Sequence, residues 1–181
     1  MRIVAGAWRG RVLTAPPGTG TRPTADRVRQ ALFDMLLHVP WGGRDAVAGV
    51  RVLDAFAGTG ALGLEALSRG AAQAVFIEQD RAALAALRAN IAVCGAAAQC
   101  SVLACDVLRA PSGQACGLVF LDPPYGADLV PRAVVRLRDG GWIVPGTLIV
   151  AEAGREERLD LPAPLLADRA HGAARLLVWR G

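Results

Sequence analysis

The sequence contains no lysine and a single tyrosine; all 20 basic residues are arginine, and aromatic residues make up 5% of the chain. It also lacks any uncharged apolar run of the roughly 18 to 20 residues that a membrane-spanning helix needs. Arg2 and Arg9 interrupt the first apolar stretch too early for a signal peptide. These absences predict a cytoplasmic protein with no membrane partner.

Cysteine and histidine are too few and too scattered for a metal centre. The chain has 4 cysteines and 2 histidines, and no two cysteines form a C-x-x-C pair. A structural zinc site needs four such ligands, with at least some of them closely spaced. We therefore expect no bound metal, and we expect the cysteines to be reduced, buried thiols.

The basic charge is concentrated at the N-terminus. Residues 1–30 hold six arginines against one acid, Asp26, whereas the remaining residues hold 14 arginines against 15 acids. A basic segment of this kind suits contacts with nucleic-acid phosphates, although a solvated extension would look the same. The candidate RNA contacts are Arg9, Arg11, Arg27 and Arg29.

The first 40 residues differ in pattern from the rest. Two short alternating stretches, at 2–8 and 11–14, predict a hairpin, and a proline- and glycine-rich loop follows. Apolar residues at three- and four-residue spacing then predict a helix from Thr24 to about Leu37, with Thr24 as its N-cap. We interpret residues 1–40 as a basic hairpin-and-helix extension and residues 41–181 as the main domain.

From about residue 50, short apolar strands alternate with helices. The predicted strands cover residues 50–54, 74–78, 101–104, 118–121, 148–151 and 174–179, and the main helices cover 62–68, 80–93 and 129–137. Since the strands are almost continuously apolar, both faces of their sheet must be covered. With 181 residues and 53% apolar composition, the chain fits one α/β fold with a mostly parallel sheet.

A glycine-rich loop follows the first of these strands. Gly58, Gly60 and Gly63 satisfy G-x-G-x-x-G, and Glu78 ends the second strand 20 residues after Gly58. This context predicts a nucleoside-containing cofactor whose ribose hydroxyls bond to the acid. Asp54 at the mouth of the loop would repel a pyrophosphate but attract a cationic amine, which favours S-adenosylmethionine over a dinucleotide. The alternative for Asp54 is a simple strand-end turn residue.

The third strand ends in Cys105, Asp106 and Val107. Here the Asp106 carboxylate is a candidate acceptor for an adenine amino group, and the Val107 N–H is a candidate donor to a ring nitrogen. The alternative is that Asp106 caps the following turn.

The fourth strand runs directly into Asp122, Pro123, Pro124 and Tyr125, the most specific motif of the chain. Ligands of open α/β sheets bind at the carboxyl ends of the strands. Two prolines fix the backbone and remove competing N–H groups, which leaves acceptors suited to an exocyclic amino group. Tyr125 offers a flat face for a planar base or amide.

Together these motifs resemble the class I S-adenosylmethionine-dependent amino-methyltransferases, with DAFAGTG at 54–60 and DPPY at 122–125. The stretches RIVAGAWRGR at 2–11, RPTADRVR at 22–29 and GALGLEALSRG at 60–70 narrow the resemblance to the RsmD family. Members of this family methylate the exocyclic N2 of a guanine in small-subunit (16S) ribosomal RNA.

The resemblance implies a Rossmann-like sheet of seven strands with an antiparallel last strand, acting as a monomer on assembled or assembling small subunits. It also implies two sets of site residues. The implied catalytic residues are Asp122, Pro123, Pro124 and Tyr125. The implied cofactor-binding residues are Asp54, Phe56, Ala57, Gly58, Gly60, Glu78, Gln79, Asp106, Val107, Arg22 and Thr24.

Other functions use parts of the same pattern. An adenine-N6 DNA methyltransferase or a protein glutamine methyltransferase would share the proline motif, but 181 residues leave no room for a large DNA-recognition domain. A dinucleotide-dependent oxidoreductase would share the glycine loop, but not Asp54 or the proline motif. A cofactor-binding RNA chaperone without catalysis would have no need for the glycine loop, Asp54 and the proline motif together.

Overall fold

A computed structural model describes residues 1–16, 23–123, 128–155, 157–171 and 174–181, without the side chains of residues 23–25. The α-helices are α1 (Pro23–His38), α2 (Ala61–Ser68), α3 (Arg81–Cys94) and α4 (Leu129–Asp139). The strands are β1 (Arg51–Asp54), β2 (Gln73–Glu78), β3 (Cys100–Ala104), β4 (Leu118–Leu121), β5 (Leu148–Gly154), β6 (Leu165–His171) and β7 (Ala174–Arg180). Short 3-10 turns are η1 (Arg44–Ala46), η2 (Ala97–Gln99) and η3 (Val107–Arg109).

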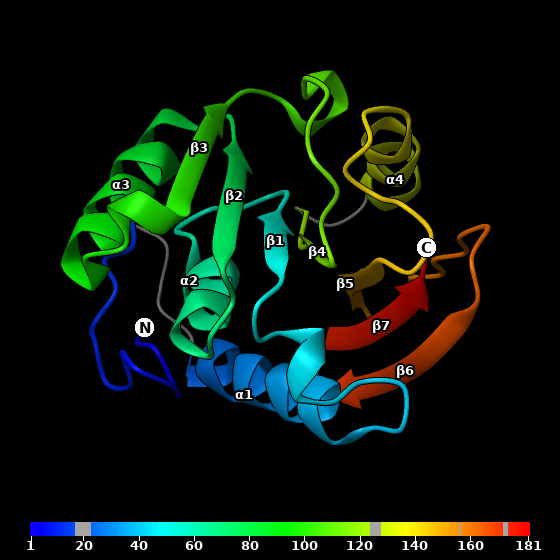
Figure 1. The fold of residues 1–181 in the computed structure, drawn as a ribbon, viewed down its shortest axis with the longest axis horizontal. Coiled ribbons are helices and arrows are strands. Elements are labelled where there is room, and N and C mark those ends of the chain that lie inside the picture. The colour runs from blue at the N-terminus through cyan, green and yellow to red at the C-terminus, as the bar shows by residue number, and fades with distance from the viewer. Residues whose placement is uncertain (17–22, 124–127, 156, 172–173) are drawn as a thin grey trace.

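The strands form one 7-stranded sheet in the order β3-β2-β1-β4-β5-β7-β6 (Figure 1). Neighbours from β3 through β5 pair in parallel, whereas β7 is antiparallel to both β5 and β6. The predicted α/β fold, with its antiparallel last strand, is confirmed. The strand pattern did not predict β6, an edge strand whose residues include Asp168 and Arg169.

Helices cover the two faces of the sheet unequally. Leu32 and Phe33 of α1 share a buried cluster with α2, α3 and Phe120 of β4. Val134 and Leu137 of α4 belong to a second cluster on the opposite face. Figure 1 shows α4 apart from the other three helices. Because α1 packs on the sheet itself, the N-terminal residues belong to the same core as the rest of the chain.

The predicted N-terminal hairpin is present, but its pairing is short. One antiparallel bridge joins Arg2 to Val12, flanked by a 2.9 Å bond from the Ile3 N–H to the Arg11 carbonyl. The chain between them turns instead of extending. The reason is that four of its backbone N–H groups, those of Val4, Ala5, Ala7 and Trp8, bond to helix α2 and not to a partner strand.

Two polar side chains of α2 bind residues 1–14, the N-terminal segment. Glu65 accepts hydrogen bonds from the backbone N–H groups of Val4 (2.8 Å) and Ala5 (3.0 Å). Ser68 Oγ accepts from the Trp8 N–H at 2.9 Å. Glu65 is fully buried, so it accepts these bonds away from water. The segment is therefore held by specific acceptors and is not a free arm.

Two further contacts fix its path. The Asn90 side chain of α3 donates at 2.9 Å to the carbonyls of Thr14 and Thr59, which links the segment to the glycine loop. Gly6 adopts a φ of +79°, and a Cβ there would lie 1.9 Å from the Ser68 carbonyl oxygen. Only glycine allows the backbone to approach α2 this closely.

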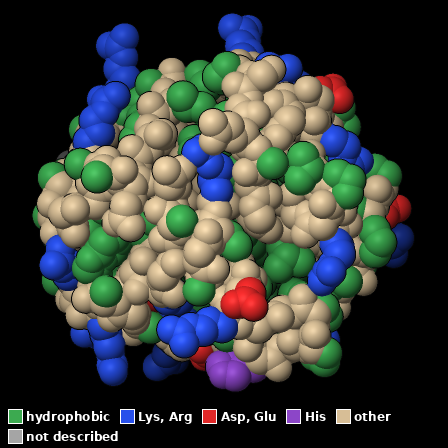
Figure 2. Space-filling view, viewed as in Figure 1, with side chains coloured by type: hydrophobic (Ala, Val, Ile, Leu, Met, Phe, Trp, Pro, Cys, Tyr) green, Lys and Arg blue, Asp and Glu red, His purple; other side chains and the backbone are tan. Residues whose placement is uncertain are grey.

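Figure 2 shows no concentrated basic patch on the face that it draws, since the arginine side chains are scattered over that face and along its outline. Among the described residues, no helix has the length and apolar character needed to cross a bilayer. Nor does the described part of the chain bring three or more potential metal ligands together. Cys94 and Cys116 are buried as expected, whereas Cys100 and Cys105 are half-buried.

Candidate functional site

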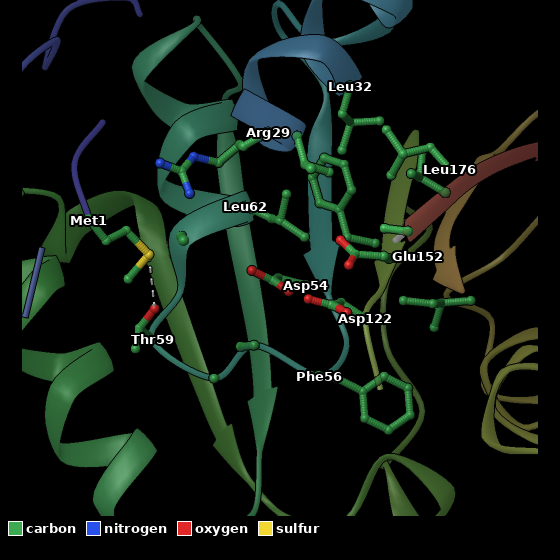
Figure 3. A pocket seen from close by; sticks show the side chains of 18 of the residues that line it. Met1, Arg29, Leu32, Asp54, Phe56, Thr59, Leu62, Asp122, Glu152 and Leu176 are labelled. Atoms are coloured by element: carbon green, nitrogen blue, oxygen red, sulfur yellow. Dashed lines mark hydrogen bonds between the residues drawn. The ribbon is translucent and has the colours of Figure 1, made fainter. Parts of the chain in front are cut away.

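A pocket of about 420 Å³ lies at the carboxyl ends of the central strands (Figure 3). The strand order reverses between β1 and β4, and such a switch point is where open α/β sheets bind ligands. The residues that line the pocket come from strand ends, the glycine loop, α1, α2 and the N-terminus. They include Met1, Arg29, Leu32, Asp54, Phe56, Ala57, Gly58, Thr59, Leu62, Phe120, Asp122, Glu152, His171 and Leu176.

The glycine loop brings its backbone and Asp54 to this pocket. Asp54 Oδ2 accepts a 2.9 Å hydrogen bond from the Gly63 N–H, in the first turn of α2. Gly60 precedes that helix with a φ of +79°, and a Cβ there would lie 2.3 Å from Leu87. The loop is therefore packed tightly against α3 while Asp54 binds the N-terminus of α2.

Burial raises the pKa of Asp54 to about 7; the Gly63 hydrogen bond lowers it, and the negative charge of Glu78 raises it. The carboxyl group is 1% exposed. Since desolvation disfavours its charged form, a cationic ligand in the pocket would stabilise the ionised carboxylate. Asp54 thus suits an ammonium group far better than a phosphate.

Glu78 joins the glycine loop to the start of α3. Its Oε2 accepts from the Gly58 N–H, and its Oε1 accepts from the N–H groups of Gln79 and Asp80, each at 2.8 Å. A carboxylate offers about four lone-pair sites, so these three bonds leave one, on Oε2, for a ribose hydroxyl. Glu78 and Gln79 lie beside the loop, outside the lining of the pocket.

Asp106 also lies outside the pocket lining, at the end of β3. Its Oδ1 accepts at 2.9 Å from the Leu108 N–H, so it caps the turn η3. This is the capping role that the sequence left open, and the second carboxylate oxygen is still available in principle to an adenine amino group. Val107 next to it has a buried side chain.

Asp122 stands at the end of β4 and faces the pocket. Desolvation, together with the negative charges of Glu152 and Asp54, raises its pKa to about 7. Part of its surface is exposed, and its side chain lines the pocket. Pro123 follows it, half-buried; Pro124 and Tyr125 lie outside the described residues.

Helix α1 forms a wall of the pocket, and here the structure corrects one prediction. Arg29 is 4% exposed; its guanidinium donates to the Arg2 carbonyl and to Asp26, and its Nε lies 3.5 Å from Glu65. A side chain buried in these contacts is not a surface RNA contact. Of the other predicted residues nearby, Arg22 and the side chain of Thr24 lie outside the part that the structure describes.

The remaining predicted RNA contacts are on the surface. Arg9, Arg11 and Arg27 are exposed. Arg11 also donates to the Val93 carbonyl at 2.6 Å, which orients its side chain along α3. These arginines surround the N-terminal segment instead of lining the pocket.

Several pocket residues were not predicted from the sequence, among them Met1, Glu152 and His171. Met1 reaches the pocket, where the Thr59 hydroxyl lies 3.9 Å from its sulfur (Figure 3). Glu152 at the end of β5 and His171 at the end of β6 complete the far wall. None belongs to a local motif, because each is brought to the site by pairing or packing between distant segments.

The residues of this site fit S-adenosylmethionine. The buried Asp54 suits an ammonium group, and the glycine loop is fixed by Glu78, an acid at the strand end where a ribose is usually bound. The pocket volume is in the range of small-molecule sites. At the ends of β4 and β5, Asp122 and Glu152 present acceptors to a second ligand, and Asp122 lies close enough to Asp54 for their charges to interact.

Comparisons with known proteins point the same way. The family model described as "Conserved hypothetical protein 95" matches residues 1–179. Ribosomal RNA small subunit methyltransferase D of Escherichia coli K12 is 42% identical over 161 residues, which cover 88% of this chain and 77% of that protein. The protein of the same name from Haemophilus influenzae is 36% identical over 179 residues, covering 95% and 89% of the two chains.

Solved structures share the fold. One from Escherichia coli has a TM-score of 0.85 at 37% sequence identity, covering 99% of this chain and 97% of that one. An RNA methyltransferase from Salinibacter ruber, solved in complex with S-adenosyl-L-homocysteine, has a TM-score of 0.65 at 18% identity, covering 88% and 93%. At that identity the second likeness concerns the fold alone.

Proposed function

The chain belongs to the RsmD family of methyltransferases, and on that premise we propose that it transfers a methyl group from S-adenosylmethionine to the exocyclic N2 of a guanine in small-subunit ribosomal RNA. One observation carries the proposal: Asp122 of the proline motif and Asp54 of the glycine loop line the same pocket. Because the proposed substrate is ribosomal RNA, we also propose that the protein acts in the cytoplasm.

The cofactor would be held on the glycine-loop side of the pocket. Asp54 and the backbone around Gly58 would bind the methionine end, Glu78 the ribose, and Asp106 the adenine amino group. When bound, S-adenosylmethionine supplies a methyl group activated by the positive charge on its sulfur. No metal is needed for this chemistry.

The protein's own residues would mainly position the guanine. Its N2 is a weak nucleophile because the lone pair is delocalised into the ring, so orientation contributes much of the rate. The Asp122 carboxylate and the Pro123 carbonyl would accept from the two N2–H bonds and direct the lone pair toward the methyl group. Asp122 would also stabilise the positive charge that develops on N2 as the N–C bond forms and the sulfur–methyl bond breaks; N2 would then lose one proton to the carboxylate or to water. Tyr125 is proposed to stack on the base from the motif alone, with the base swung out of its helix.

Residues 1–40 are proposed to act in both parts of the site. Met1, Arg29 and Leu32 line the pocket, whereas Arg9, Arg11 and Arg27 are exposed on the surface. The extension would thus shape the cofactor pocket from one side and bind rRNA phosphates on the other.

The decisive experiment is transfer of labelled methyl from S-adenosylmethionine to small ribosomal subunits that lack this modification, with naked rRNA and duplex DNA beside them. We expect label in subunit RNA, recovered as N2-methylguanine. Incorporation only into DNA or protein would retain the cofactor and reject the ribosomal substrate. No incorporation at all, together with no cofactor binding, would reject the proposal entirely.

Glu78→Ala should weaken S-adenosylmethionine binding by about 10- to 100-fold, since it removes charge-assisted hydrogen bonds worth about 1.5–3 kcal/mol. Calorimetric titration would measure the dissociation constant. Asp80→Ala is the matched control, because Asp80 caps α3 through the Ala83 N–H at 2.8 Å but has no proposed cofactor contact. An affinity equal to wild type in Glu78→Ala would remove Glu78 from the ribose site.

Replacing Arg9 and Arg11 together by glutamine should weaken rRNA binding and flatten its salt dependence by about 1.5 to 2 in log–log slope, as two phosphate contacts are lost. The measurement is a filter-binding series over salt concentration. The control pair is Arg132→Gln with Arg138→Gln, exposed on α4 across the sheet. An unchanged slope would show that the basic segment is only solvated.

The alternatives are less well supported. Adenine-N6 and protein glutamine methyltransferases share the proline motif, but the relatives that match 88% and 95% of this chain are named as rRNA methyltransferases.

A further inference from the structure

Glu152 lies beside Asp122 because of the register of two strands. Strands β4 and β5 pair in parallel up to Leu121 opposite Ala151, so the next residues of each strand are Asp122 and Glu152. Side chains alternate between the faces of a sheet, and Phe120 lines the same pocket two residues before Asp122. Both acids therefore point into the pocket from strands about 4.8 Å apart, as Figure 3 shows.

The negative charges of Asp122 and Glu152 repel each other. Desolvation raises the pKa of Asp122, and the charge of Glu152 is the next largest cause. A second acid is not required to bind N2–H, for which Asp122 and the Pro123 carbonyl suffice. A ligand that presents adjacent hydrogen-bond donors to both carboxylates would relieve their repulsion.

Guanine has such a pair of donors. On its Watson–Crick edge the N1–H lies next to the N2 amino group, whereas adenine presents an acceptor at N1. An ionised carboxylate next to the N2 acceptors would therefore attract guanine and repel a base with an N1 lone pair. Leu176, which pairs opposite Glu152 on β7, supplies an apolar wall that keeps this contact partly desolvated.

Resting on the proposed function, we infer that Glu152 is the residue that selects guanine, by accepting a hydrogen bond from N1–H while Asp122 binds N2–H. Its role is to read the base and not to hold the cofactor. Glu152→Gln keeps the length and shape of the side chain but can place an N–H where the carboxylate oxygen was.

The test compares guanine with 2-aminopurine, which keeps the N2 amine but has a lone pair at N1. Small subunits are reconstituted with either base at the position that wild type methylates, and single-turnover rates are measured. Wild type should prefer guanine by about 10- to 100-fold. Glu152→Gln should lose most of that preference, because it slows on guanine and its amide N–H can donate to the N1 lone pair of 2-aminopurine. Its dissociation constant for S-adenosylmethionine should stay within about threefold.

Asp139→Asn, an exposed acid at the end of α4 outside the pocket, is the matched control and should keep the wild-type preference. Equal slowing of Glu152→Gln on both bases, an unchanged preference, or a large loss of cofactor affinity would each overturn the inference. If wild type methylates no guanine N2, both the proposed function and this inference are rejected. If wild type does so and Glu152→Gln keeps full preference, the inference alone fails.

Discussion

Replacing Asp122 with alanine is expected to reduce methyl transfer by about 10²- to 10³-fold or more, the usual cost of removing a group that stabilises developing charge. The carboxylate lies in the pocket at the end of β4, where desolvation strengthens its interaction with a positive charge on N2. Since the cofactor contacts lie on the glycine loop, its dissociation constant should change by no more than about threefold. Single-turnover rates and calorimetric titration measure the two effects.

Asp122→Asn separates charge from hydrogen bonding. It keeps one acceptor oxygen, so it should be more active than the alanine variant but less active than wild type. The pKa of Asp122 is raised to about 7, and only the ionised form accepts on both oxygens, so the wild-type rate should rise through about pH 7. The asparagine variant should lack that rise. Near wild-type turnover by Asp122→Ala would remove Asp122 from catalysis.

The sheet was predictable because its signal is local. Each central strand is a short apolar run, and β4 (Leu118–Leu121) has the predicted bounds. Asp54 ends the first strand and Asp122 directly follows the fourth, so the rule that ligands bind at carboxyl ends was enough to bring them together. Their meeting in one pocket confirms the placement, whereas their chemical roles stay predictions.

The rest depends on contacts between distant segments. Strand β6 has no continuous apolar run, since an edge strand exposes much of its surface. Arg29 carries the same charge as its exposed neighbours, and only its packing between Asp26 and Glu65 shows that it is buried. Glu152 becomes a pocket residue through the register of β5 with β4. No spacing within the sequence reports any of these.

Glu65 is the clearest example of a residue whose role depends on contacts between distant segments. Its removal should have the largest effect on the stability of the protein. It is fully buried and accepts from the backbone of Val4 and Ala5 and from Arg69 Nε at 2.8 Å, with Arg29 Nε at 3.5 Å. Glu65→Ala would leave two nearly buried guanidinium groups with less counter-charge and two backbone donors unpaired. Breaking such a network costs about 3–5 kcal/mol. Urea denaturation would measure the loss.

Glu65→Ala should also release the N-terminal segment locally under conditions in which the rest of the protein stays folded. Without Glu65 the N-terminal segment loses its acceptors on α2, so trypsin should cleave after Arg9 or Arg11 in the native protein faster than in wild type. Glu65→Gln keeps one acceptor oxygen and should be intermediate in both measurements. Because Met1 and Arg29 line the pocket, release of the segment should lower cofactor affinity as well.

A loss of stability under about 1 kcal/mol with unchanged cleavage would contradict this account, since removing a buried charge network costs more than that. In that case Glu65 would not stabilise the N-terminal segment. The apolar packing of α1 alone would then have to fix the shape of the pocket wall.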